Sequence, residues 1–148
     1  MNILILNQQN KKINKNRIKR LAKEILKNLA YPNDVEISIL LTNDNFIKGL
    51  NKKYLKKDKP TDVLSFPMFT LQTPNSKLQT PNLLGDIVIS IDTAEKQAAL
   101  QKTSLNDEIA RLLIHGVLHL LGFEHEKGGK KALEMRREER RLIDLLKV

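Results

Sequence analysis

The sequence predicts an α+β fold: a single mixed four-stranded sheet with helices packed on it and a histidine-bearing helix at its centre. Short runs rich in β-branched residues predict four strands, and longer runs with apolar residues every three or four positions predict four or five helices. After an initial strand, these elements follow in the order α-β-α-β-β-α-α, which is typical of an α+β domain. With 148 residues, we expect the chain 1–148 to form a single domain.

Apolar spacing predicts two strand–helix pairs in the first part of the chain. Residues 2–6 form a short strand-like run, and Asn14 can cap a helix whose apolar positions repeat at helical spacing. Val35 begins an alternation of apolar and polar residues that predicts a half-buried strand. The expected elements are a strand at 2–6, a helix at 15–29, a strand at 35–41 and a helix that starts at 42–44 and includes Tyr54.

Proline and capping residues divide the second part. Pro60 breaks the preceding helix, and the prolines at 60 and 67 favour an edge strand at 63–66. The unit LQTPN occurs twice within 71–82, which we interpret as a loop insertion. The remaining expected elements are a strand at 83–91, a helix at 92–100, a helix that starts after Ser104 and carries the histidines, and a charged helix at 130–147. At Asp86 we favour a turn residue over a functional carboxylate, and at Glu108 a surface carboxylate in the first helical turn.

Composition and charge limit the possible functions. The chain has no cysteine, so disulfides and thiolate metal sites are excluded. The apolar run at the N-terminus is too short for a signal peptide and no run reaches transmembrane length, so we expect a cytoplasmic protein without a membrane role. Residues 1–60 hold 14 Lys and Arg against 5 Asp and Glu, which accounts for the whole net charge of +9. This asymmetry is typical of a protein that binds RNA or DNA, although it equally suits a protein kept soluble by lysine.

All three histidines lie within one stretch. His115 and His119 are four residues apart in an apolar run, so a helix places both imidazoles on the same face. Gly122 follows where a left-handed residue ends a helix, and His125 can then approach the same point from the other side. Three neutral imidazoles around one point predict a zinc site with an open fourth ligand position. Another divalent transition metal could take the place of zinc. The alternative is that each histidine is an ordinary core residue.

The spacing H-x3-H-x2-G-x2-H is also that of the metzincin zinc proteases. Those enzymes keep a general-base glutamate directly after the first histidine, and this chain has Gly116 there. Glycine cannot take a proton from a metal-bound water. The spacing therefore predicts a metal site, and Gly116 argues against an ordinary peptidase.

Three blocks of sequence resemble the YbeY family over roughly residues 35–145. They are Pro60-Thr-Asp-Val-Leu-Ser-Phe-Pro67, Gly85-Asp-Ile-Val-Ile-Ser90 and His115-Gly-x-Leu-His-Leu-x-Gly-x-x-His125. The resemblance implies a metal-dependent hydrolase domain: a single-strand-specific endoribonuclease of 16S rRNA 3′-end maturation and ribosome quality control. It also implies one zinc ion per chain held by His115, His119 and His125. The implied partners are rRNA, the small ribosomal subunit and its assembly proteins.

The chain departs from the family pattern at two positions. Leu55 stands where the family usually has an arginine, after Asn51-Lys-Lys-Tyr54, so Lys53, Lys56 or Lys57, together with Ser65, is expected to contact the RNA. A solvated helix end is the alternative interpretation of these lysines. Glu124 replaces the usual aspartate before the last histidine and is the candidate general base, although it could instead orient His125. A zinc hydrolase of peptides or other small substrates and a non-catalytic ribosome-assembly factor remain the alternative functions.

Overall fold

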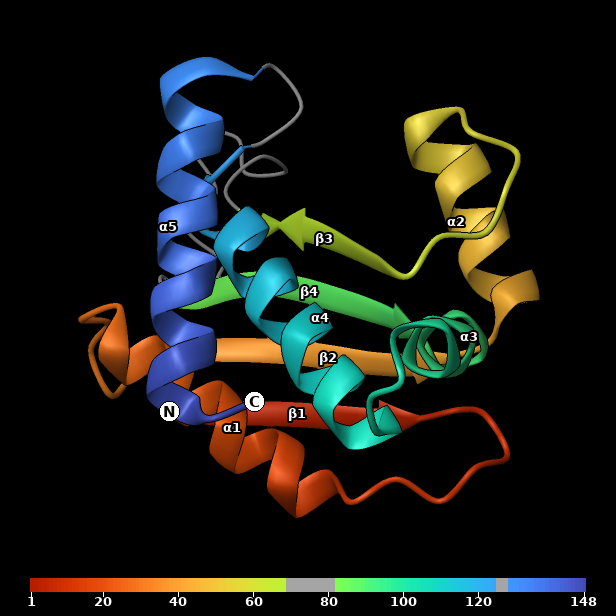
Figure 1. The fold of residues 1–148 in the computed structure, drawn as a ribbon, viewed down its shortest axis with the longest axis horizontal. Coiled ribbons are helices and arrows are strands. Elements are labelled where there is room, and N and C mark those ends of the chain that lie inside the picture. The colour runs from red at the N-terminus through yellow and green to blue at the C-terminus, as the bar shows by residue number, and fades with distance from the viewer. Residues whose placement is uncertain (69–81, 125–127) are drawn as a thin grey trace.

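The computed structural model describes residues 1–68, 82–124 and 128–148, and these residues form the predicted α+β arrangement (Figure 1). The predicted elements are confirmed, and their ends differ from the predictions by one or two residues. Apart from Asn82, the proposed insertion at 71–82 lies outside the described residues. The elements are β1 (Asn2–Asn7), α1 (Lys15–Asn28), β2 (Glu36–Thr42), α2 (Asp44–Leu55), β3 (Val63–Pro67), β4 (Leu83–Ser90), α3 (Ile91–Gln101), α4 (Leu105–Leu120) and α5 (Gly129–Leu146).

The four strands form one mixed sheet in the order β1-β2-β4-β3. β1, β2 and β4 run parallel, and β3 pairs antiparallel with β4 at the edge. The prolines around β3 therefore mark an edge strand, as predicted. The turn predicted at Asp86 is wrong: Asp86 lies inside β4, opposite Ser38 and Phe66, with its side chain exposed. The β-branched residues that follow it continue the strand through this position.

Helices cover both faces of the sheet. One face contributes the buried side chains of Ile39 and Ile87, and α1 and α4 pack against it. α5 packs on α4 and α1 and completes the main core. The other face is covered at its β4–β3 side by α2, where Ile47 contacts Leu64 and Val88. Figure 1 shows α4 crossing in front of the sheet between α5 and α3, the central position predicted for the metal-site helix. None of the described helices combines the length and apolar character needed to span a bilayer.

Local sequence explains where α4 begins and ends. The Ser104 side chain accepts a hydrogen bond from the Asp107 backbone N–H at 3.0 Å, which caps the helix N-terminus. Gly122 has a φ of +97°, so the left-handed turn predicted after the helix is confirmed. The surface position predicted for Glu108 is wrong, because its side chain is only 1% exposed. Arg111, one turn later, pairs with both carboxylate oxygens and so allows the buried charge.

Gly116 allows α4 to lie close to the sheet. A Cβ at this position would be 3.0 Å from Cγ2 of Ile87 and 3.1 Å from Cγ2 of Val63, both of which belong to strands. The missing side chain thus faces the sheet. A glutamate here would be directed into packed aliphatic groups, which gives the structural reason why this position cannot hold a metalloprotease base.

Candidate metal centre and cleft

His115 and His119 present their imidazoles side by side on α4. Their Nε2 atoms are 3.1 Å apart, and the rings meet edge to face with centroids 4.6 Å apart. Two nitrogens bound to one tetrahedral zinc ion would be roughly 3.3 Å apart, because Zn–N bonds measure about 2.0–2.1 Å. The two imidazoles therefore fit two ligand positions of such a site.

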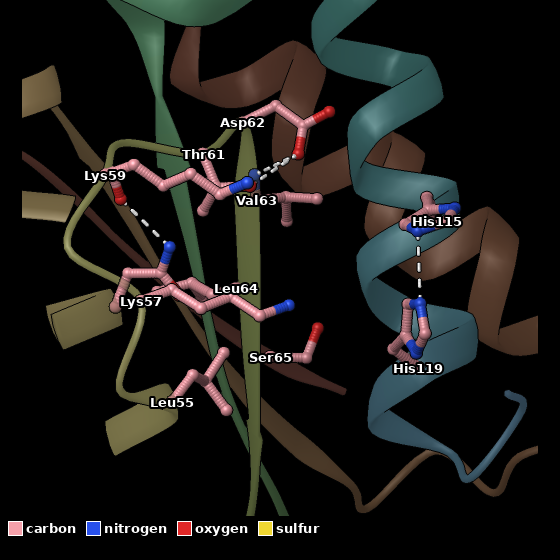
Figure 2. A pocket seen from close by; sticks show the side chains of 11 residues that line it. Leu55, Lys57, Lys59, Thr61, Asp62, Val63, Leu64, Ser65, His115 and His119 are labelled. Atoms are coloured by element: carbon pink, nitrogen blue, oxygen red, sulfur yellow. Dashed lines mark hydrogen bonds between the residues drawn. The ribbon is translucent and has the colours of Figure 1, made fainter. Parts of the chain in front are cut away.

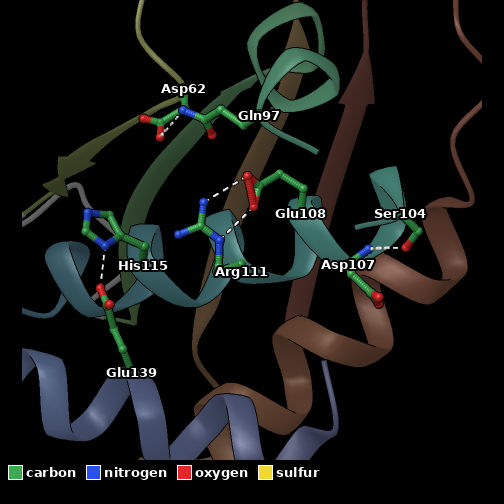
Figure 3. Close-up of polar contacts among 8 residues, drawn as sticks. All are labelled: Asp62, Gln97, Ser104, Asp107, Glu108, Arg111, His115 and Glu139. Atoms are coloured by element: carbon green, nitrogen blue, oxygen red, sulfur yellow. Dashed lines mark hydrogen bonds and ion pairs between the residues drawn. The ribbon is translucent and has the colours of Figure 1, made fainter. Parts of the chain in front are cut away.

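Glu139 on α5 holds the first of these histidines. Its Oε1 atom pairs with Nδ1 of His115 (Figure 3). When Nδ1 carries the proton and its N–H donates a hydrogen bond to a carboxylate, Nε2 keeps the lone pair that binds a metal. This contact fixes both the ring orientation and the tautomer that suit ligation. Its partners lie 24 residues apart, on two helices that pack together, so sequence spacing gave no signal for it.

A cleft of about 520 Å³ lies between α4, β3 and the segment that joins α2 to β3. Figure 2 shows His115 and His119 on the helix wall, Lys57 and Lys59 on the opposite loop wall, and β3 between them. Its volume is in the range of small-molecule and nucleotide pockets. The lining residues are Asn51, Leu55, Lys57, Lys59, Thr61, Asp62, Val63, Leu64, Ser65, His115 and His119.

The structure distributes the predicted RNA-contacting residues unevenly. Lys57 and Ser65 line the cleft, and the Ser65 hydroxyl donates a hydrogen bond to the Gly116 carbonyl at 2.7 Å, which joins β3 to the metal-site helix. Lys53 lies instead over the ring of Tyr54, with Nζ 5.2 Å from the centroid. Lys56 is the left-handed residue that ends α2. Neither Lys53 nor Lys56 belongs to the cleft lining.

The other two predicted site residues lie beyond α4. Glu124 is exposed and lines a separate shallow hollow with Phe123 and Lys131. His125 lies outside the described residues. Within the described ranges, no group of three or more His, Asp or Glu side chains is close enough to hold a metal ion. The third ligand therefore stays a prediction.

Asp62 and Lys59 also line the cleft. The sequence predicted no separate role for Asp62, and it included Lys59 only in the basic run 52–59, which could hold phosphates. One oxygen of Asp62 accepts a hydrogen bond from the Val63 N–H at 2.7 Å (Figure 2). The other accepts a hydrogen bond from Gln97 at 3.2 Å (Figure 3). These bonds hold the carboxylate at the start of β3. Position 62 belongs to the block that carries the family resemblance, which was the available signal. Lys59 offered no signal beyond its charge.

Arg111 lies one turn before His115 on α4. The hydrogen bonds to Glu108 raise the pKa of its guanidinium, and the charges of Asp62 and Glu139 raise it further. Arg111 therefore remains a cation, and its positive charge stabilises the carboxylates that border the histidine pair.

Comparison with known proteins gives the family. The model of the family Endoribonuclease YbeY matches residues 4–147. The chain belongs to this family.

Its curated relatives carry the same name. A YbeY endoribonuclease of Aquifex aeolicus is 43% identical over 98% of this chain and 92% of its own length. One of Persephonella marina is 44% identical over 91% of this chain and 86% of its own. The solution structure of TM1509 from Thermotoga maritima superposes with a TM-score of 0.58 at 26% identity and covers 98% of this chain and 91% of that one. The predicted family and fold class are confirmed.

Proposed function

We propose that this YbeY-family endoribonuclease is a zinc enzyme that cleaves single-stranded RNA in 16S rRNA 3′-end maturation and ribosome quality control. The small ribosomal subunit and its assembly proteins would be its partners, in the cytoplasm. Family membership supports an endoribonuclease that acts on rRNA. The net charge of +9 in residues 1–60 supports a polyanionic partner.

The observation that carries the metal assignment is the pair of Nε2 atoms 3.1 Å apart beside the cleft, with Glu139 behind His115. His115 and His119 would supply two ligands and His125 the third. A zinc ion held there would act as a Lewis acid on a phosphate oxygen and lower the pKa of its bound water. The donor set of neutral imidazoles fits zinc, copper, iron or nickel better than magnesium or calcium.

The residues of the chain have separate tasks in this proposal. Glu139 orients His115, and Ser65 fixes β3 against the helix that carries both histidines. Cations on the loop wall would bind the RNA backbone. The general base is unassigned, and Glu124 remains the candidate for it. Its exposed position next to His125 also suits the alternative role of orienting that histidine.

The first experiment is cleavage of a labelled single-stranded RNA with and without chelator, with His119→Ala as the inactive control and metal content measured in parallel. We expect one metal per chain in the native protein, much less in His119→Ala, and cleavage only by the metal-loaded native protein. One bound metal without cleavage of RNA would refute the stand-alone nuclease and favour an assembly factor. Cleavage of peptides instead would favour the zinc-hydrolase alternative.

The general base needs its own experiment. Glu124→Gln removes the basic carboxylate and keeps the side-chain shape. If Glu124 takes the proton in the cleavage step, the rate of the metal-loaded variant falls by about 100-fold or more. Native cleavage by Glu124→Gln would exclude this role.

A further inference from the structure

The lysines of α2 and of the loop that joins it to β3 differ in what they contact. Lys48 and Lys52 both point to Asp58, with Nζ–carboxylate distances of 3.9 Å in each case. Lys53 lies over the ring of Tyr54. Asp58 partly neutralises the first two lysines, and none of the three belongs to the described lining of the cleft.

Lys57 and Lys59 are the two lysines of this segment that line the cleft. In the described part of the chain, no carboxylate is within ion-pair distance of either one. Figure 2 shows both on the wall that faces the histidines. Asp62, the carboxylate of the described lining, already accepts hydrogen bonds from Val63 and Gln97. The loop wall thus offers two cations for an anionic group placed between it and α4.

One buried residue fixes this wall. Asn51 lies near the end of α2 and is 2% exposed. Its backbone carbonyl accepts hydrogen bonds from the backbone N–H groups of Lys56 and Lys57, the latter at 3.2 Å. Its side-chain Nδ2 donates to the Lys59 carbonyl at 2.9 Å. The side chain and the backbone carbonyl of Asn51 therefore hold both ends of the loop 56–59. A buried amide with these partners restricts the loop to one conformation.

We propose that Asn51 is a positioning residue that holds Lys57 and Lys59 as a two-cation clamp for an RNA phosphate, opposite the histidine pair. This inference rests on the proposed function, because it assigns the phosphate subsite of the same cleft. The clamp takes one backbone phosphate next to the reacting one, since each ammonium donates to phosphate oxygens as a point charge.

The test is the salt dependence of binding of the full, metal-loaded protein to a labelled 2′-O-methyl single-stranded RNA. A control incubation first verifies that the protein does not cleave this RNA. Each phosphate contact on a single strand contributes about 0.7 to the slope of log K against log salt. We expect the Lys57→Ala/Lys59→Ala double variant to lower the magnitude of the slope by about 0.7 and to weaken binding at 0.1 M salt by about fivefold, and each single variant to give part of this loss. Lys48→Ala is the matched control: Lys48 pairs with Asp58 outside the cleft lining, so its removal leaves the slope unchanged.

Asn51→Leu, which keeps the side-chain volume and removes the donor, separates positioning from simple charge. We expect it to lower the magnitude of the slope by up to about 0.7 and to weaken binding by up to about fivefold although every lysine is present. In the Lys57→Ala/Lys59→Ala background, Asn51→Leu should change nothing further, as a thermodynamic cycle requires for residues acting through one another. A structural role alone would give additive losses.

The outcomes distinguish this inference from the proposed function. If the native protein binds RNA and the two lysine variants keep its salt slope, the clamp is refuted and the nuclease proposal stands. If the native protein binds no RNA at all, both fail. If Asn51→Leu does not fold, Asn51→Ala and the lysine variants still decide, because the lysines are exposed side chains whose removal leaves the core intact.

Discussion

The carboxylate behind His115 allows a quantitative prediction. Glu139→Ala removes the acceptor of the Nδ1–H of His115. Loss of such an outer partner typically weakens metal binding by about 10–100-fold, or about 1.4–2.8 kcal/mol. Here the His115 side chain is 29% exposed and that of Glu139 is 25% exposed, so water can replace the lost acceptor. We therefore expect the lower end of the range, about tenfold weaker zinc binding.

The assay is zinc titration against a competing chromophoric chelator, with thermal unfolding as a check on folding. Glu139→Gln keeps an oxygen that can accept the same hydrogen bond without its charge, so its affinity should lie between those of native protein and Glu139→Ala. Glu138→Ala is the matched control: Glu138 is the neighbouring carboxylate on α5, and it pairs with Arg141 at 2.6 Å. Zinc affinity of folded Glu139→Ala within twofold of native would refute the reasoning.

Three further predictions concern stability and the cleft. Ser90→Ala removes the α3 cap and a hydrogen bond to Asp44, which should cost about 2–3 kcal/mol and lower the melting temperature by roughly 4–12 °C in calorimetry. Burial raises the pKa of Asp44, but hydrogen bonds from Ser90 and Thr93 lower it more, so its net pKa is depressed. The ionised Asp44 carboxylate stabilises the fold fully above its unfolded-state pKa, and this stabilisation is lost as the pH falls through the lower folded-state pKa. Ser90→Ala removes one of these hydrogen bonds, so its melting temperature should fall less between neutral and acid pH than that of the native protein, measured in a pH series of melts. Leu55→Arg adds a cation to a half-exposed position of the cleft lining and should raise the RNA salt slope by about 0.7; an unchanged slope would count against the loop wall as the RNA side. Gly116→Glu should destabilise the fold by about 3 kcal/mol or more and create no peptidase activity, measured by denaturant unfolding and a peptide assay.

Local patterns predicted the framework and the histidine pair. His115 and His119 follow from an i, i+4 spacing within an apolar run, and Gly122 follows from its place after that run, because both depend on geometry within a few residues. The edge position of β3 follows in the same way from its flanking prolines. Such features need no knowledge of how distant elements pack.

The errors and omissions share one physical origin. Glu108 was expected at the surface because first-turn carboxylates are usually solvated, yet the tertiary packing of α4 buries it. Arg111 lies three residues after Glu108, at the spacing of a helical ion pair, and this spacing was the local signal that Glu108 could be buried with a partner. Glu139 and Lys59 reach the site through contacts between α5 and α4 and through a loop held by a buried amide. Neither contact leaves a periodic pattern in the sequence.

The two walls of the cleft should respond differently to mutation, because they are held in different ways. The helix wall is part of the core: Gly116 fits against Ile87 and Val63, and Ser65 bonds to its carbonyl. Changes there alter folding and metal affinity together. The loop wall carries exposed lysines, and buried Asn51 anchors their backbone, so changes to the lysines should alter RNA affinity at constant stability and constant metal content. If Lys57→Ala lowered the zinc affinity as well, the two walls would be coupled through the fold, and the division of tasks inferred from their contacts would be wrong.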